Sequence, residues 1–100
     1  ASALITIGDL HLDTVMHSVS LHGSPVRLTA MEYGLLAYLA HHAGRPISKT
    51  ELTEHLYDQD FDRDSNTLEV LVARLRKKLG DAKIETLRGQ GYRLVLPDAA

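Results

Sequence analysis

The sequence predicts an α+β domain in which a small antiparallel sheet precedes three helices and a final β-hairpin. Residues 4–28 alternate apolar and polar side chains between Gly and Pro residues, which is typical of short antiparallel strands. Two helix-start motifs and one long apolar stripe follow, and two strand-like segments then flank residues 88–91. The 100 residues are enough for one domain with a modest core.

The composition fits a folded, water-soluble chain, with 44% apolar and 24% charged residues. No apolar run approaches the roughly 18 residues that a membrane span needs. No signal peptide opens the sequence, so we expect a cytoplasmic protein. The chain has no cysteine, which excludes disulfides and thiolate chemistry. The sequence contains no recognisable Ser-His-Asp or paired-carboxylate arrangement of catalytic residues. We therefore expect neither an enzyme nor a cofactor.

The N-terminal segment is predicted to form three or four short strands. Its apolar residues come in pairs separated by one polar residue, beginning with Ile5 and Ile7 and ending with Val26 and Leu28. Such period-two pairs place one side of each strand against a core. The clearest turn among them is at residues 22–25, which combine Gly and Pro.

The same N-terminal motif predicts two helices. Thr29 precedes Glu32 by three residues, and Ser48 precedes Glu51 by the same interval. In such a capping box the hydroxyl accepts a hydrogen bond from a free backbone N–H, and the carboxylate bonds back to the first residue. The first helix is predicted over residues 29–43 and the second over residues 48–57. An acidic loop is predicted to follow over residues 58–64.

An apolar stripe predicts a third helix over residues 65–79. Its five side chains have the i, i+3, i+4, i+7, i+11 spacing of a helix with one buried face: Leu68, Leu71, Val72, Leu75 and Leu79. At about 100° per residue, the opposite face carries Asn66, Val70, Ala73 and Lys77. Gly80 suits the end of this helix, and a hairpin is predicted over residues 84–96.

Positive charge is concentrated near the end of the chain. Residues 71–93 hold seven of the eleven Lys and Arg residues and two carboxylates, a net +5, although the whole chain carries −2. A helix fits the major groove of DNA, and a basic hairpin beside it can reach the minor groove. Phosphates respond to charge within a Debye length of about 8 Å, so local charge matters more than the total. The alternative is a solvated helix end whose cations favour the helix dipole.

Three stretches resemble the effector domains of OmpR/PhoB-type response regulators, most of all the PhoP subgroup: LTAMEYGLLAYLAHHAGRPISKTELTEHLY, SNTLEVLVARLRKKLG and IETLRGQGYRL. The resemblance covers almost the whole chain. It implies one winged helix-turn-helix domain over residues 1–100, with a four-stranded N-terminal sheet, a recognition helix at 65–79 and a hairpin wing. The implied function is sequence-specific binding of double-stranded DNA, as the output of a two-component system whose receiver domain is absent from this chain.

The resemblance also implies individual DNA contacts. In the recognition helix these are Asn66, Thr67, Val70, Ala73, Arg74, Arg76 and Lys77. In the wing they are Thr86, Arg88 and Tyr92, with Arg88 entering the minor groove, and Tyr57 contacts the DNA backbone. Several family members carry Arg or His where this chain has Asn66, Leu71 and Ala73, so indirect readout and cooperativity are expected to contribute more here.

Further partners follow from the same resemblance. A phosphorylated receiver is expected to drive homodimerisation on direct-repeat half-sites, and the isolated domain is expected to be a monomer. The loop residues Asp60, Phe61 and Asp62 are candidates for contact with RNA polymerase.

Other interpretations remain open at this point. The segment from Asp58 to Glu69 has oxygen ligands at the spacing of a calcium loop, but Arg63 stands where the sharp turn requires Gly. We therefore predict no metal site. Tyr92 is equally well suited to packing within the wing. The basic face could also bind an acidic protein partner, because fold does not determine function.

Overall fold

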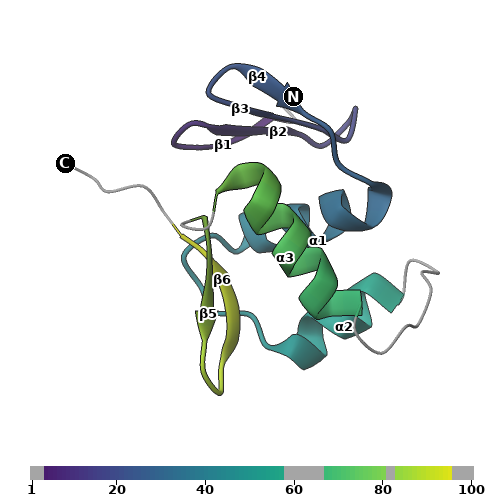
Figure 1. The fold of residues 1–100 in the computed structure, drawn as a ribbon, viewed down its shortest axis with the longest axis vertical. Coiled ribbons are helices and arrows are strands. Elements are labelled where there is room, and N and C mark those ends of the chain that lie inside the picture. Colours follow the sequence, from purple (N-terminus) through teal and green to yellow (C-terminus); the bar gives the residue numbers. More distant parts are fainter. Residues whose placement is uncertain (1–3, 58–66, 81–82, 96–100) are drawn as a thin grey trace.

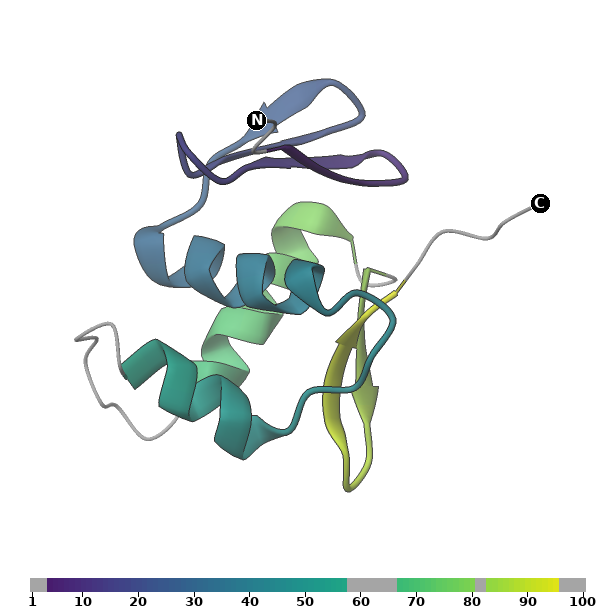
Figure 2. The same ribbon diagram turned by 180° about the vertical axis from the view of Figure 1, so that it is seen from behind.

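The computed structural model describes residues 4–57, 67–80 and 83–95. The described chain forms a four-stranded sheet, three helices and a two-stranded hairpin (Figure 1). The sheet lies at one end of the molecule, the helices pack beneath it, and the hairpin stands beside the helices (Figures 1 and 2). The predicted fold class is therefore confirmed. No helix among these residues is both long and apolar enough to cross a membrane.

The N-terminal sheet is a simple antiparallel meander with strand order β1-β2-β3-β4. The strands are β1 Leu4–Ile7, β2 Leu10–Asp13, β3 Ser18–Leu21 and β4 Ser24–Val26. The register places Leu12 opposite Val19, and both side chains are buried in the core together with Leu10. The Asp13 carboxylate accepts hydrogen bonds of 3.0 Å from two backbone N–H groups of the β2–β3 turn. The sequence predicted either three or four strands, and the structure has four.

Helices α1 (Ala30–His41) and α2 (Lys49–Tyr57) both begin at the predicted caps. The box before α1 is complete, since Glu32 N–H donates to Thr29 Oγ1 at 3.2 Å and Thr29 N–H donates to Glu32 Oε1 at 2.9 Å. Before α2, Glu51 N–H donates to Ser48 Oγ at 3.0 Å. The Glu51 carboxylate, however, accepts a hydrogen bond from the Tyr38 hydroxyl of α1. The second glutamate thus links the two helices instead of closing a reciprocal box in the described chain.

Helix α3 (Thr67–Leu79) buries the predicted apolar stripe against the rest of the core. All five stripe residues, from Leu68 to Leu79, are at most 7% exposed. The helix ends at Gly80, whose φ is +107° and whose N–H donates to Arg76 O at 2.8 Å. The predicted first residues of this helix, 65 and 66, lie outside the described residues, as does the predicted loop 58–64.

The C-terminal hairpin pairs β5 (Ile84–Leu87) with β6 (Gly91–Leu94). The other edge of β6 is joined to the linker between α1 and α2. Ile47 and Tyr92 exchange two backbone hydrogen bonds of 2.8 and 2.9 Å, and Gly44 N–H donates to Leu94 O at 3.0 Å. The hairpin is consequently held on the helices by main-chain bonds as well as by buried side chains.

Gly91 permits this close approach, and replacing it by Ala is expected to lower the free energy of unfolding by about 2–4 kcal/mol. An added Cβ would lie 2.0 Å from Ile47 O, and the φ of +115° disfavours any side chain. Denaturant unfolding followed by circular dichroism measures the loss. Gly89→Ala is the matched control, because its φ is +77° but an added Cβ meets no atom within 4 Å. The control should lose about 1 kcal/mol; equal losses would show that the Ile47 contact is unimportant.

Candidate nucleic-acid interface

The face of α3 that points away from the core is exposed and carries acidic, basic and apolar side chains. Its described members are Glu69, Val70, Ala73, Arg74 and Lys77. Val70 is 40% exposed, although the same helix has a fully apolar buried stripe. Because the stripe fixes the rotation of α3 about its axis, these five side chains face outward together. Such a face presents two cations, one carboxylate and two apolar side chains to a partner.

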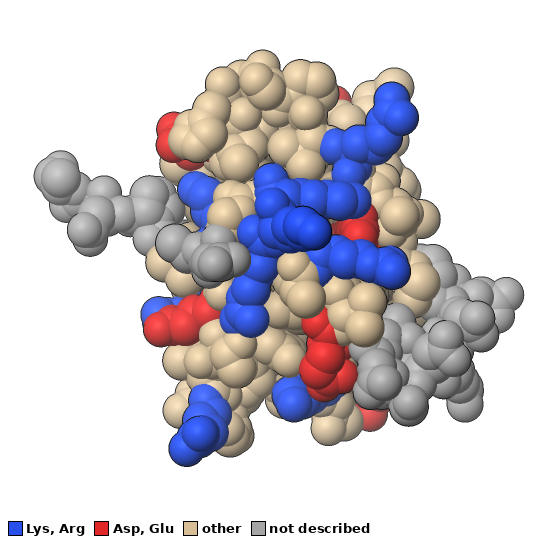
Figure 3. Space-filling model, in the orientation of Figure 1, with Lys and Arg blue, Asp and Glu red and all other residues tan. Residues whose placement is uncertain are grey.

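Lys and Arg side chains gather over α3 on this face of the molecule (Figure 3). A further cation lies at the tip of the β5–β6 hairpin in the same view. The hairpin turn spans residues 88–90, and Arg88 is exposed there. The helix and the hairpin tip therefore offer positive charge toward one side, although the chain as a whole is slightly negative. This geometry suits a polyanion long enough to contact both elements.

Arg76 joins the two elements of this surface. Its Nε donates to Ile84 O of β5 at 3.0 Å, and its terminal nitrogen donates to the Thr86 hydroxyl. The guanidinium group is half-buried between α3 and β5 as a result. Since a guanidinium has five N–H donors, Arg76 retains donors for a ligand. Its contacts within the chain set the position of the hairpin relative to α3.

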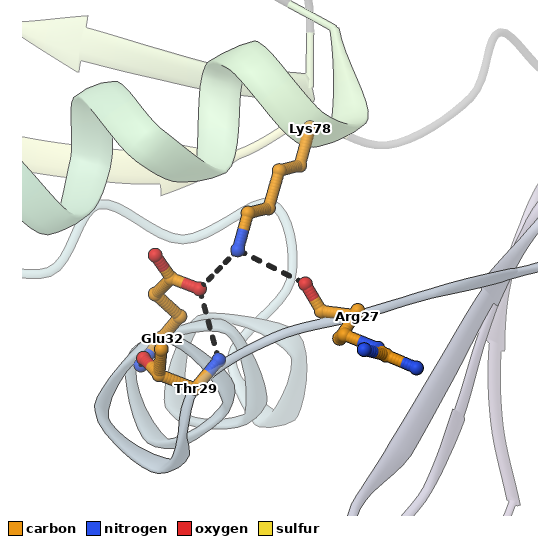
Figure 4. Close-up of polar contacts among 4 residues, drawn as sticks. All are labelled: Arg27, Thr29, Glu32 and Lys78. Atoms are coloured by element: carbon orange, nitrogen blue, oxygen red, sulfur yellow. Dashed lines mark hydrogen bonds and ion pairs between the residues drawn. The ribbon is translucent and has the colours of Figure 1, made fainter.

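Lys78 connects the other end of α3 to the N-terminus of α1 (Figure 4). Its ammonium donates to Glu32 Oε1 at 2.6 Å and to Arg27 O at 2.9 Å. Glu32 is only 1% exposed, and its carboxylate also accepts the backbone N–H of Thr29. Burial by itself would raise the pKa of Glu32. The hydrogen bonds from Lys78 and Thr29, with the charges of Lys78 and Arg74, outweigh burial and lower the pKa below its ordinary value of 4.5.

A groove of about 430 Å³ separates the start of α2 from the hairpin. It is lined by residues 48–50 on one side and 86–91 on the other, so Lys49 and Arg88 both border it. Lys49 Nζ lies 3.5 Å from Glu69 Oε2 of α3. The first turns of α2 and α3 and the hairpin thus meet at one place on the basic side of the domain.

The structure brings together many, but not all, of the predicted site residues. Val70, Ala73, Arg74 and Lys77 share one exposed face, with exposed Arg88 at the hairpin tip. Arg76 and Thr86 bond to each other. Tyr92 is 4% exposed and packs in the core, as the alternative interpretation of this residue expected. The remaining candidates, or their side chains, lie outside the described structure: Tyr57, Asp60, Phe61, Asp62, Asn66 and Thr67.

Sequence reasoning missed the pairs that hold this surface in place. Lys78 and Glu32 are 46 residues apart, and a capping glutamate is ordinarily expected at the surface. The pairing of Lys49 with Glu69 likewise crosses from one helix to another. The available signal was weak: the C-terminal turn of α3 holds three cations, and nothing in their spacing names a partner.

Comparisons with known proteins converge on one family. Residues 23–94 match the family described as "Transcriptional regulatory protein, C terminal". The two-component response regulator PhoP of Pseudomonas aeruginosa is 46% identical over 92 residues, covering 88% of this chain and 41% of PhoP. The chain therefore spans less than half the length of this relative.

Two solved structures are similar over nearly the whole chain. The crystal structure of the DNA-binding domain of CpxR from E. coli has a TM-score of 0.83 and 27% identity, covering 97% of this chain and 100% of that one. The Klebsiella pneumoniae RstA DNA-binding domain, in complex with the RstA box, has a TM-score of 0.80 and 33% identity, covering 92% of this chain and 96% of that one.

Replacing Lys78 by Met is expected to lower the free energy of unfolding by about 1–3 kcal/mol at neutral pH. The buried Glu32 carboxylate would keep its burial but lose its ammonium donor. The lowered pKa of Glu32 means that its contribution is present above the unfolded value and is lost as pH falls through the folded value. In the variant this acid-linked loss should shrink, because without Lys78 only the Thr29 hydrogen bond and the charge of Arg74 still oppose the effect of burial on the Glu32 pKa.

Denaturant unfolding between about pH 7 and about pH 3 measures this difference. Lys77→Met is the control, because Lys77 is a neighbouring exposed cation of the same helix. If the Lys78 and Lys77 variants unfold alike across this range, the buried pair does not stabilise the fold.

Proposed function

The chain belongs to the family of C-terminal domains of transcriptional regulatory proteins, that of the OmpR/PhoB-type response regulators, and from this premise we propose that it binds double-stranded DNA sequence-specifically. In this proposal the domain is the output unit of a two-component response regulator and controls transcription. The supporting observation is the shared orientation of the exposed face of α3 and the basic tip of the hairpin (Figure 3). A major groove admits one helix, and the adjacent minor groove is within reach of a hairpin beside it.

In this proposal, side chains on the exposed face of α3 contact both phosphates and bases. Lys77 shares this face with Val70 and Ala73, and Arg74 lies at its border. The cations suit phosphates of the groove walls, and the apolar side chains suit the methyl group of thymine. Asn66 and Thr67 at the start of the helix extend this face in the proposal, and Tyr57 adds a contact to the DNA backbone.

The hairpin supplies the second contact. Arg88 is exposed at its tip, where it enters the minor groove in the proposal. Thr86 and Arg76, already bonded to each other, contact phosphates between the two grooves. Tyr92 supports the hairpin through burial, so its part in binding is chiefly to hold β6 in place.

The remaining partners concern the longer protein. We propose that a receiver domain drives homodimerisation, and that two effector domains then occupy direct-repeat half-sites. We also propose that Asp60, Phe61 and Asp62 contact RNA polymerase. PhoP of Pseudomonas aeruginosa, one of the relatives with which the chain aligns, is more than twice as long as the aligned part, which leaves room for such a receiver.

Selection from a random duplex library, sequenced at two salt concentrations, tests the central proposal. A recurring short motif that survives the higher salt supports sequence-specific binding and supplies the half-site. Enrichment without a motif, lost as salt rises, contradicts it, because phosphate contacts alone depend steeply on salt. The basic face would then be assigned to an acidic protein partner.

Arg74→Ala and Arg88→Ala are each expected to weaken binding of the selected duplex by about 1–3 kcal/mol. Both side chains are exposed, so the free energy of unfolding should change by about 0.5 kcal/mol or less. Fluorescence anisotropy with labelled duplex measures the affinity. Arg45→Ala is the control, because Arg45 is an exposed cation of the linker between α1 and α2. A large loss of stability in either variant would instead make that arginine structural.

The chain without a receiver is expected to be monomeric in solution and to bind one half-site weakly. Size-exclusion chromatography with light scattering should give the mass of one chain. On a duplex with two half-sites, two copies should bind. A stable dimer without DNA would show that the effector domain, and not the receiver, supplies the dimer interface.

A further inference from the structure

We propose that Glu69 determines base preference, by accepting a hydrogen bond from the N4 amine of cytosine in the major groove. The inference rests on the proposed DNA binding and adds to it a preference for one base at one position. Glu69 is the only acidic residue between Thr67 and Leu79. It lies in the first turn of α3 and is exposed, on the helix over which Lys and Arg side chains gather. A carboxylate at this position would repel phosphates, so it weakens binding unless DNA offers it a donor.

The carboxylate is accessible and is held in place. The Glu69 side chain is 51% exposed, and Ala73, one helical turn further on, is too small to cover it. Its Oε2 lies 3.5 Å from Lys49 Nζ, which comes from the first turn of α2. The carboxylate is therefore directed along the surface between the two helices, where the wall of a major groove would lie if α3 entered that groove.

Lys49 makes a carboxylate tolerable so close to DNA. Its ammonium offsets the negative charge of Glu69 in the free protein. The Lys49 side chain is 58% exposed and borders the groove between α2 and the hairpin. On binding, Lys49 can move from the carboxylate to a phosphate, which frees both carboxylate oxygens for a base.

The donors and acceptors that the four bases present in the major groove make cytosine the best partner for the Glu69 carboxylate. An ionised carboxylate only accepts hydrogen bonds. In the major groove, guanine presents N7 and O6, and thymine presents O4, all of which are acceptors that repel it. Adenine offers its N6 amine beside the N7 acceptor, whereas cytosine offers its N4 amine without a neighbouring acceptor. Cytosine is therefore the base that an acceptor-only side chain fits.

Library selection with the whole 100-residue chain tests the inference at the level of sequence. The wild type should select cytosine at one position of the half-site. Glu69→Ala should lose the preference at that position alone, and Glu69→Gln should shift it toward adenine, which suits an amide. Asp9→Asn is the control, because Asp9 is an exposed carboxylate on the turn after β1, paired with His22 at 3.1 Å. It removes the same charge and should leave every position unchanged.

A single-atom test complements the selection. Replacing the selected cytosine by 2-pyrimidinone removes only its N4 amine. The wild type should lose affinity about five-fold or more, and Glu69→Ala should bind the two duplexes equally. Thermal unfolding of each variant checks that the fold is intact.

The outcomes separate this inference from the proposed function. If the wild type selects a motif but the Glu69 variants change affinity evenly for all sequences, Glu69 only positions Lys49 and the inference is wrong. Equal loss on 2-pyrimidinone in the wild type and Glu69→Ala also overturns it. If the wild type selects no motif, the proposed function itself fails, and this inference fails with it.

Discussion

The position of α3 depends on the Glu32 carboxylate. This group is 1% exposed and accepts hydrogen bonds from the Thr29 backbone and the Lys78 ammonium (Figure 4). Lys78 also donates to Arg27 O, in the segment that leads from the sheet to α1. Removing the Lys78 ammonium would leave the buried Glu32 carboxylate without its positively charged partner, which is costly. One ion pair thus couples the sheet, the start of α1 and the end of the exposed helix.

The hairpin is fixed by a different set of bonds. Arg76 attaches β5 to α3, and the linker residue Ile47 pairs with Tyr92 of β6. These contacts use backbone groups, the half-buried guanidinium of Arg76 and the Thr86 hydroxyl. Arg88 is not part of these contacts, and Arg74 acts on the fold through its charge near Glu32.

Local patterns predicted the elements because each element has a local physical cause. The stripe from Leu68 to Leu79 fixed both the existence and the rotation of α3, and the Thr29 box fixed the start of α1. What failed was the assignment of charged side chains that act over long sequence separations. Glu51 has the spacing of a reciprocal cap, yet its carboxylate accepts the Tyr38 hydroxyl. For Lys78 no local pattern indicated a partner, because Glu32 lies 46 residues away in the sequence.

The attachment of the hairpin also bears on aggregation. Exposed strand edges are templates for pairing with other chains. One edge of β6 pairs with β5, and the other is occupied at Ile47 and Gly44. On β5, the Lys83 carbonyl faces Val95, so the next carbonyl, that of Ile84, points outward, and Arg76 occupies it. A second copy that approached this edge would therefore meet carbonyl and N–H groups that already have partners, and strand exchange between copies would be disfavoured.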